Sequence, residues 1–242
     1  MELLKEIYLM YAKMFNRMGM NNNLKELSKE LKREFGRNSK HEIIIVGGAA
    51  IVLKHDFRES SSDIDAIVAN GSSIKDAVHR TADRLGLPAD WLNSDFKQSS
   101  SYLSQLVAVS KYYRTFNRVL DVRIVDDKYL IAMKLKSFRP YKNDQSDIIG
   151  LLQDNTFTYE EIYSAVERLY GKENGVKSEA WEFLKKYYSA EGIGYNQIRN
   201  EELNNRDIFI KFDENYENVL NENNLDDILS MLREKKKKKK SN

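Results

Sequence analysis

The sequence predicts an α+β fold: a mixed β-sheet flanked by helices, preceded by an N-terminal helical pair and followed by a largely helical C-terminal region. Three observations lead to this prediction. Apolar residues recur at helical spacing over residues 1–35, a β-branched run at 42–46 ends in two glycines, and the pattern after Asp127 is almost entirely helical. With 242 residues, 41% of them hydrophobic, the chain is long enough to bury a real core.

Two helices are expected at the start of the chain, separated by the polar residues Asn21, Asn22 and Asn23. Their apolar stripes are Leu4, Ile7, Tyr8 and Tyr11 in the first helix and Leu24, Leu27, Leu31 and Phe35 in the second. Residues three or four apart share one face of a helix, so each stripe can pack against other elements. We assign residues 1–36 to two helices that pack on the core.

The core is assigned to residues 37–126 and begins with the strand at 42–46. Gly47 and Gly48 then make a tight turn into a short helix. The remaining elements expected here are a strand at 64–68, a helix at 73–85, and strands at 106–109 and 119–125. The last two strands are expected to pair as neighbours, with a polar, aromatic stretch between them.

Residues 127–234 are expected to form a helical C-terminal domain. The sequence Thr158-x-x-Glu161 is a capping box, which marks the start of one helix. The other helices expected here are at 129–138, 144–152, 178–188 and 225–233. The asparagine-rich stretch at 196–224 shows no clear periodicity.

The charge distribution excludes one class of function for the body of the chain. The 39 Lys and Arg against 37 Asp and Glu give +2, but six of these are the run Lys235 to Lys240, without which the net charge is +2 − 6 = −4. The body is therefore not a basic nucleic-acid binder overall. We interpret residues 235–242 as a solvated, disordered tail; the alternative is a weak, salt-sensitive attraction to RNA or DNA.

Cysteine is absent, which excludes disulfides, thiolate metal sites and cysteine nucleophiles. No apolar run approaches the roughly 20 residues that span a bilayer, and the N-terminus mixes charges into its apolar pattern. We therefore expect a soluble cytoplasmic protein with no signal peptide and no membrane partner.

Asp63 and Asp65 are the strongest candidates for metal ligands. Alternate residues of a strand point to one face, so the two carboxylates of Asp63-Ile64-Asp65 are expected to converge. Such a pair suits Mg²⁺ or Mn²⁺, which favour carboxylates together with substrate phosphates. Asp121 lies between apolar residues on a later strand and is expected to add a third carboxylate. Asp126 and Asp127 compete for that place, although Asp127 is better explained as a helix N-cap.

Gly47 and Gly48 end a strand and open a helix, where a phosphate can approach the backbone and bind the helix N–H groups. Either glycine alone is a weak signal. A strand, two glycines, a helix and then Asp63-x-Asp65 is a much more specific order. The alternative interpretation is that the glycines only form a turn and the acids face solvent.

In these motifs the sequence resembles the nucleotidyltransferase superfamily that includes DNA polymerase beta and kanamycin nucleotidyltransferase. The variant Gly-Gly-Ala-Ala followed by Arg58, Ser61 and Asp-Ile-Asp is most similar to the AbiEii-like, minimal nucleotidyltransferases of toxin–antitoxin and abortive-infection systems. The resemblance covers about residues 40–155. It implies catalytic metals on Asp63, Asp65 and Asp121, and a nucleotide bound at Gly47, Gly48, Arg58 and Ser61.

A second match is Lys134 followed by Asp144-x-x-Asp147. It is similar to the lysine and paired-aspartate motif of the AbiEii-like group. The resemblance implies that Lys134 and Asp144 bind the nucleotide and that Asp147 is a catalytic or orienting base. The alternative is a structural ion pair that fixes the helical part to the sheet.

The expected function is metal-dependent transfer of NMP from an NTP to a hydroxyl of an acceptor, either tRNA or a partner protein. The resemblance implies a toxin-like component with a possible cognate antitoxin. Two alternatives remain open. One is a non-catalytic binding protein or antitoxin that keeps the fold, and the other is an antibiotic nucleotidyltransferase.

Overall fold

A computed structural model describes residues 13–68, 71–173 and 175–215 and confirms the α+β fold. Its centre is a five-stranded mixed sheet in the order β3-β2-β1-β5-β4. The strands are β1 His41–Ile45, β2 Ile64–Val68, β3 Leu92–Asn93, β4 Ser110–Phe116 and β5 Leu120–Val125. The pairs β1–β5 and β2–β3 are parallel, whereas β1–β2 and β4–β5 are antiparallel.

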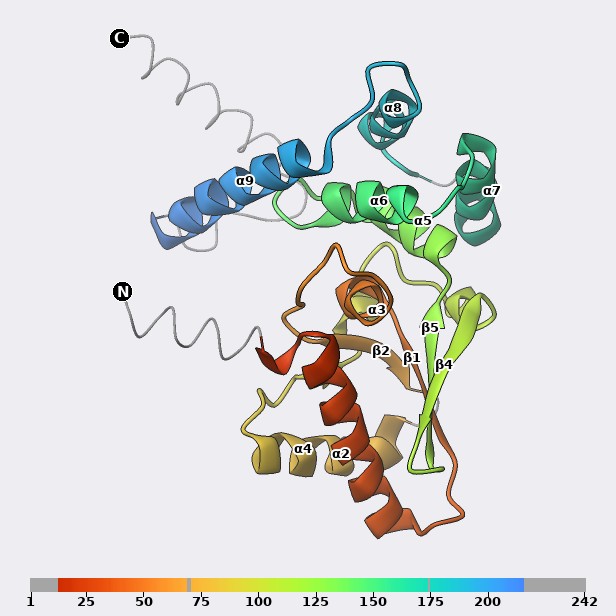
Figure 1. Cartoon of the computed structure of the whole chain (residues 1–242), viewed down its shortest axis with the longest axis vertical. Helices are drawn as coiled ribbons and strands as arrows, with labels where there is room; N and C mark the ends of the chain where they lie inside the picture. The colour runs from red at the N-terminus through yellow and green to blue at the C-terminus, as the bar shows by residue number, and fades with distance from the viewer. Residues whose placement is uncertain (1–12, 69–70, 174, 216–242) are drawn as a thin grey trace.

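The helices lie toward the two ends of the molecule. They are α2 Arg17–Phe35, α3 Gly47–Lys54, α4 Gly71–Leu85, α5 Asp127–Ser137, α6 Asp144–Gln153, α7 Tyr159–Tyr170, α8 Ser178–Tyr187 and α9 Tyr195–Asn215. Figure 1 shows α2 and α4 at one end, α5 to α9 gathered at the other, and α3 between them. The helix α3 therefore lies between the helical half of the chain and the pair α2 and α4.

The middle of the sheet is buried on both faces. Ile43, Ile44 and Ile45 alternate between the two faces of β1 and all three are buried, as is Val122 of the neighbouring β5. Burial on both faces explains why β1 ends in three successive apolar residues rather than in an alternating pattern. Each such side chain stabilises the fold by roughly 1.5–3 kcal/mol through removal from water. This rigid centre supports the loops at the carboxyl end of β1.

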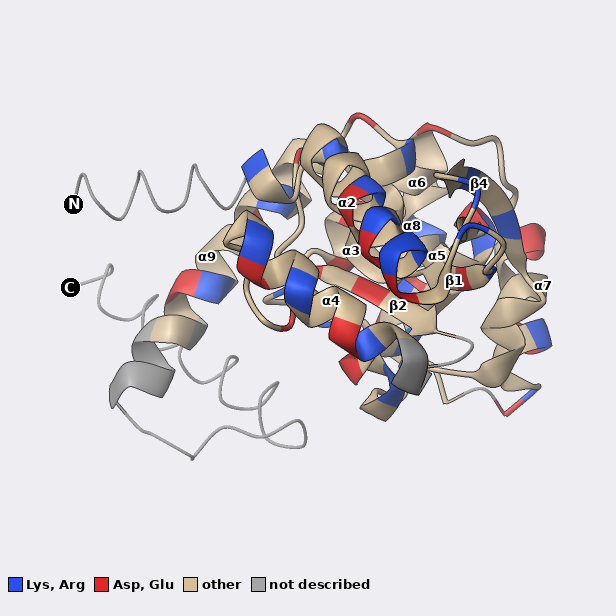
Figure 2. Cartoon of the chain, turned by 90° about the horizontal axis from the view of Figure 1, so that it is seen from below, with Lys and Arg blue, Asp and Glu red and all other residues tan. Residues whose placement is uncertain are grey.

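Charged side chains join α4 to α2. Arg80 pairs with Glu30 and Glu34, and Arg84 pairs with Glu26 and Glu30. Figure 2 shows basic and acidic residues interleaved along both helices. The charged character of these helices is therefore used within the fold.

The prediction of two N-terminal helices is corrected in part. The predicted first stripe falls at residues 4–11, outside the described residues. The predicted break at Asn21-Asn22-Asn23 is wrong, because α2 begins after its N-cap Asn16 and continues through all three residues. Their amides are accommodated locally: Asn21 Nδ2 donates to the carbonyl of Arg17 at 2.8 Å, and buried Asn23 donates to that of Met14 at 3.0 Å.

The prediction of a strand at residues 106–109 is also wrong. Residues Ser104–Val107 form a 3-10 turn, and the partner of β5 is β4, which occupies the polar stretch expected to be a connection. The strand β4 lies at the sheet edge and exposes much of its length, so it can be polar. Asn117 and Arg118, both with positive φ, make the tight turn into β5.

The helical half follows the prediction with two corrections. The N-cap of α5 is Asp126, not Asp127, whose carboxylate instead pairs with Lys54 and His55. The helix α9 occupies most of the stretch that showed no periodicity, whereas the helix predicted at 225–233 and the lysine tail lie outside the described residues. The capping box of Thr158 and Glu161 is confirmed. No helix in the described parts of the chain is long and apolar enough to cross a bilayer.

Candidate active site

The turn between β1 and α3 forms the floor of the candidate site. Gly47 has φ of +61°, in the left-handed region that glycine occupies without strain. Gly48 is required for space, because a Cβ there would lie 2.5 Å from Nη2 of Arg58 and 2.9 Å from Oγ of Ser61. The start of α3 therefore lies directly against the side chains of Arg58 and Ser61.

Asp63 and Asp65 lie beside this turn. Asp63 immediately precedes β2, Asp65 is its second residue, and both side chains are half-buried. The carbonyl of Asp65 accepts a hydrogen bond from the N–H of Val46 at 3.0 Å, which fixes Asp65 next to Gly47. A Cβ on Gly47 would be 3.4 Å from Oδ2 of Asp65. The structure therefore brings the two acids and the two glycines together.

The neighbouring strand β3 adds an amide to the pair. Asn93 is in register with Asp65 and donates from Nδ2 to Oδ2 of Asp63 at 3.0 Å. Burial and the charge of Asp63 raise the pKa of Asp65 to about 6, against the lowering effect of Lys134 and Arg139. The two carboxylates thus repel each other at neutral pH, and a bound cation would relieve that repulsion.

The donor set fits a divalent metal that also binds phosphate. Asp63 and Asp65 supply hard oxygen ligands, and Mg²⁺ commonly takes one or two carboxylates while substrate phosphates and water complete its shell. In the part of the chain that the structure describes, no group of three or more His, Cys, Asp or Glu is arranged to hold a metal by itself. The pair is therefore suited to a metal that arrives with a nucleotide.

The structure does not bring Asp121 to this pair. Ile45 of β1 lies opposite Ala66 of β2 and Ile124 of β5, whereas Asp121 lies opposite Glu42. Asp121 is thus four residues along the sheet from the level of Asp65, roughly 13 Å at the usual rise of a strand. Its carboxylate accepts a hydrogen bond from Thr115 in the β4–β5 hairpin. The position on β5 level with Asp65 is one residue beyond Ile124, and it is a buried valine.

Lys134 of α5 occupies the centre of a buried ion-pair network. Its Nζ is 2.9 Å from Oδ1 of Asp144 and 2.9 Å from Oδ2 of Asp147, both on the first turn of α6. Burial alone would lower the pKa of Lys134, but the two aspartates outweigh it and raise that pKa. The two aspartates share a face as predicted, and they hold α5 against α6.

The aspartates have further partners. Arg139 donates to Asp144 from its backbone N–H at 3.0 Å and from Nε at 2.9 Å, and Arg58 donates to Asp147 at 2.5 Å. Burial acts to raise the pKa of Asp144, yet Lys134 and Arg139 hold it below its ordinary value. These contacts favour the interpretation of Asp144 and Asp147 as ion-pair partners that orient Lys134, Arg139 and Arg58.

Most of these residues, but not Asn93 or Asp147, line one polar cleft of about 650 Å³ between the sheet and the helical half. The lining residues are Gly47, Gly48, Arg58, Ser60, Ser61, Ser62, Asp63, Asp65, Lys134, Arg139, Lys142, Asn143, Asp144, Arg199 and Arg206. Six cations and three carboxylates are among them, so the lining carries an excess of positive charge. A cleft with carboxylates at one place and cations around them suits a polyphosphate bound with a metal.

The residues in or beside the cleft that the sequence did not predict include an amide and four cations: Asn93, Arg139, Lys142, Arg199 and Arg206. Ser60, Ser62 and Asn143 of the cleft lining were not predicted either. Arg139 and Lys142 lie in the short connection between α5 and α6, on either side of Pro140 and Tyr141. Their closeness in sequence to Lys134 could have indicated a cationic binding surface. Arg199 and Arg206 are seven apart on α9, a spacing that puts both on one helix face. That signal required recognising α9 as a helix.

A smaller recess of about 190 Å³ opens beside the acids. It shares Gly47, Asp65, Lys134 and Arg139 with the cleft, and four apolar residues and three serines complete its lining. Those residues are Val46, Phe96, Leu130 and Met133, together with the hydroxyls of Ser99, Ser101 and Ser137. An apolar surface next to a cationic cleft is suited to a ligand that joins a flat, partly polar group to an anionic one.

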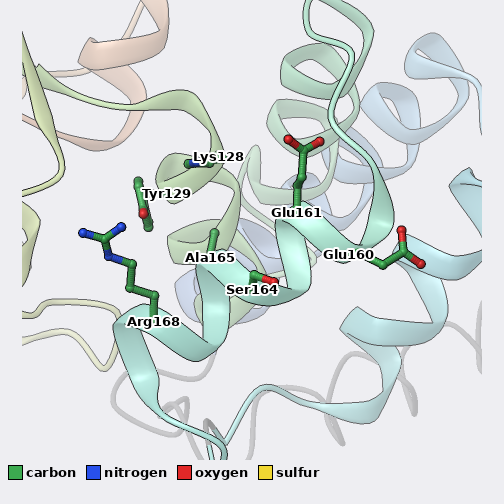
Figure 3. Close-up of a pocket in the computed structure, with 7 residues that line it drawn as sticks. All are labelled: Lys128, Tyr129, Glu160, Glu161, Ser164, Ala165 and Arg168. Carbon is green, nitrogen blue, oxygen red and sulfur yellow. The ribbon is translucent and has the colours of Figure 1, made fainter.

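Another pocket, of about 300 Å³, lies between the start of α5 and α7 and shares no lining residue with the cleft. Figure 3 shows Glu160 and Glu161 of that pocket pointing apart. Glu161 is used in the capping box, and Lys128 and Arg168 both lie near the ring of Tyr129. The polar groups of this pocket do not converge on one point, so we do not include it in the candidate active site.

The fold and the cleft together define a class of protein. A strand ending in two glycines, set beside alternating carboxylates on the antiparallel neighbour, is the arrangement of a nucleotidyltransferase. Residues 22–179 match the family described as "Nucleotidyltransferase of unknown function (DUF6036)", about two thirds of the chain, and the chain belongs to that family. The predicted superfamily is thereby confirmed, and the match does not single out the AbiEii-like group. Comparison with curated proteins and with solved structures finds no match.

Proposed function

We propose that this protein transfers NMP from an NTP to a hydroxyl of an acceptor, with Mg²⁺ or Mn²⁺ held by Asp63 and Asp65. The observation that carries the proposal is the position of these two carboxylates beside the Gly47-Gly48 turn, in one cleft with six cations. A bound metal would neutralise phosphate charge and polarise the phosphoryl group. The cleft residues bind and orient the nucleotide around it.

The proposed reaction exchanges one bond at the α-phosphorus for another. The acceptor oxygen forms a bond to the α-phosphorus, the bond from that phosphorus to the bridging oxygen breaks, and pyrophosphate leaves. The hydroxyl proton passes to a carboxylate of the pair or to solvent. Ser61, Arg58 and the N–H groups at the start of α3 lie together and are proposed to bind the phosphates.

Lys134 lines the cleft, but its ammonium already lies between Asp144 and Asp147. We therefore propose that Lys134 contributes its charge to the nucleotide site from a fixed position. Asp147 is held by both Lys134 and Arg58, so we propose an orienting role for it rather than a proton-accepting one.

The acceptor is proposed to be RNA, with tRNA as the first candidate and a partner protein as the second. The resemblance of the Gly-Gly-Ala-Ala and Asp-Ile-Asp motifs to the AbiEii-like group supports a toxin-like role in a cytoplasmic toxin–antitoxin or abortive-infection system. An antibiotic acceptor would need a pocket for a polycation, and the excess of cations in the cleft argues against it.

The test is a labelling reaction with the full chain. The protein is incubated with Mg²⁺, each α-labelled NTP in turn, and a mixture of cellular RNA and protein, and the labelled fraction is identified. The Asp63→Asn and Asp65→Asn double variant keeps the size of both side chains and is expected to lose labelling. Labelling by that variant would overturn the proposal.

Calorimetry with NTP and Mg²⁺ distinguishes the proposal from the non-catalytic alternative, a binding protein or antitoxin that keeps the fold and captures a partner through its helices. A nucleotidyltransferase is expected to bind NTP with Mg²⁺ and to release pyrophosphate when its acceptor is added. Absence of binding at millimolar NTP would favour the non-catalytic alternative and contradict the proposed function.

A further inference from the structure

The recess of about 190 Å³ beside the acids is lined mainly by two segments that are far apart in the chain. The helix α5 supplies residues spaced three and four apart, which share one side of a helix. The segment at 96–101, between β3 and β4, supplies the second set. The two sets are Leu130, Met133 and Ser137, and Phe96, Ser99 and Ser101. Each segment therefore brings both apolar groups and hydroxyls to the recess.

Contacts with other parts of the fold hold the segment 96–101 in place. Tyr170 of α7 donates from its hydroxyl to the carbonyl of Ser101 at 2.8 Å. The ring of Tyr102 packs edge-on against that of Phe96, with ring centroids 5.4 Å apart. The lining of the recess is thus ordered in advance, which lowers the cost of binding a ligand there.

The three serine hydroxyls of the recess have committed their protons within the protein. Ser137 donates to the carbonyl of Met133 at 2.9 Å. Ser99 donates to the carbonyl of Phe96 at 2.7 Å, and its oxygen lies 3.0 Å from that of Ser101. Because a hydroxyl has one proton and that of Ser99 is directed at Phe96, Ser101 is the donor in this second contact. All three hydroxyls can therefore only accept further hydrogen bonds.

The two cations of the recess also line the cleft, and both donate to one carboxylate. Lys134 donates to Asp144 at 2.9 Å, and Arg139 donates to the same residue from Nε at 2.9 Å. The recess thus has cations where it meets the cleft and hydrogen-bond acceptors among its apolar residues. A ligand with phosphates near the cations and a flat group that donates hydrogen bonds to the serines would match both parts.

We propose that the recess binds the base of the nucleoside triphosphate and selects bases with an exocyclic amino group, adenine and cytosine, over those with a keto oxygen at the same ring position. The amino group of adenine or cytosine has two N–H donors to offer to the serine oxygens. A keto oxygen there would face oxygens that can only accept, and it would lose its hydrogen bonds to water without replacement. The inference rests on the proposed function, since it names the base preference of the same site.

The test compares nucleotides that exchange the amino group for a keto group on the same ring. ATP and ITP form the purine pair, and CTP and UTP form the pyrimidine pair. In calorimetry with Mg²⁺ and the full chain, the amino nucleotide of each pair is expected to bind about 10-fold more tightly or better, the effect of one buried polar group left unpaired. Equal affinities within a pair that binds, or tighter binding of the keto nucleotide, would overturn the inference.

A double variant tests the role of the serines. Ser101→Ala together with Ser137→Ala removes two of the acceptors and is expected to bring the affinities for ATP and ITP to within about 2-fold of each other. Inorganic tripolyphosphate, which has no base, is expected to bind the variant as it binds the wild type, which also checks that the cleft is intact. Ser100→Ala, at an exposed position between two serines of the recess, is the matched control and should keep the preference for ATP. An unchanged preference in the double variant would contradict the inference.

The outcomes separate this inference from the proposed function. If the wild type binds neither NTP nor tripolyphosphate with Mg²⁺, the proposed function fails and this inference fails with it. If the wild type binds tripolyphosphate and all four NTPs alike, the phosphate cleft stands and only this inference fails. Unchanged nucleotide affinities in the double variant with impaired transfer would place the base of the acceptor in the recess, and would also overturn the inference.

Discussion

Glu202 on α9 accepts a hydrogen bond from the backbone N–H of Ser146 at 3.0 Å, although 56 residues separate the two in the chain. The contact places a carboxylate at the N-terminus of α6, where the helix dipole and the first N–H groups favour negative charge. It is one of the main polar contacts that hold α9 at the cleft. The stability of this contact depends on pH.

Raising the pH from 5 to 8 is expected to weaken the contribution of Glu202 to stability. Burial raises its pKa to about 7 from 4.5, against the hydrogen bonds of Ser146. Between these values the folded state keeps a proton that the unfolded state has lost, so stability is fullest below about 4.5 and is lost as the pH rises through 7. The effect is at most about 3 kcal/mol.

Glu202→Gln tests this, because glutamine is neutral throughout. Urea unfolding is measured at several pH values, and the difference in unfolding free energy between variant and wild type is expected to increase in favour of the variant as the pH rises. Glu201→Gln, at an exposed position on the same helix, is the matched control and should leave the pH profile unchanged. Parallel profiles for Glu202→Gln and wild type would contradict the raised pKa.

Lys134→Met is expected to destabilise the fold by about 3 kcal/mol, because it leaves the buried Asp144 and Asp147 without their shared cation. Arg139 still pairs with Asp144 and Arg58 with Asp147 in this variant. The expected loss of stability is therefore at the lower end of the range for a broken buried ion pair. Chemical denaturation measures it, with exposed Lys25→Met as the control. A loss below about 0.5 kcal/mol, the range of ordinary surface substitutions, would mean that the network is not structural.

Gly48→Ala is expected to reduce NTP affinity by about 10-fold or more, as expected when one charged phosphate contact is lost. The new Cβ would lie 2.5 Å from Nη2 of Arg58, so the guanidinium must move away from the turn and from Asp147. Gly194→Ala is the matched control, since its Cβ would make only an ordinary contact with Gln197 at 4.0 Å. Unchanged affinity in Gly48→Ala would show that Arg58 does not contact the nucleotide.

Asp121→Asn is expected to leave NMP transfer within about 2-fold of the wild type, since the side chain lies roughly 13 Å along the sheet from the level of Asp65. Its hydrogen bond from Thr115 can be kept by the asparagine oxygen. Transfer is measured with the labelled NTP used for the Asp63 and Asp65 variants. Loss of transfer comparable to theirs would make Asp121 a candidate ligand of the proposed metal again.

The local order of the chain was enough to predict the sheet centre and the closeness of the two aspartates. β1 and β2 follow from short apolar runs, and the closeness of Asp63 and Asp65 follows from the two-residue period of a strand. The glycine turn follows from the order of an apolar run, two glycines and a second apolar run, and the positive φ of Gly47 agrees with it. These features depend on neighbours in sequence, so the sequence could determine them.

Tertiary structure decided everything that depends on register or on distant segments. Asp121 lies between apolar residues, as expected of a carboxylate on a strand. The register of β5 with β1 nevertheless places it opposite Glu42, four residues along the sheet from the level of Asp65. Lys134 and the two aspartates were recognised, and only the packing of α5 on α6 could show them as a buried network. The arginines of α9 reach the cleft because Glu202 docks on α6, a contact between segments more than fifty residues apart. Side-chain periodicity is a local property, whereas the level of a strand and the docking of a helix are fixed by the packing of the whole chain.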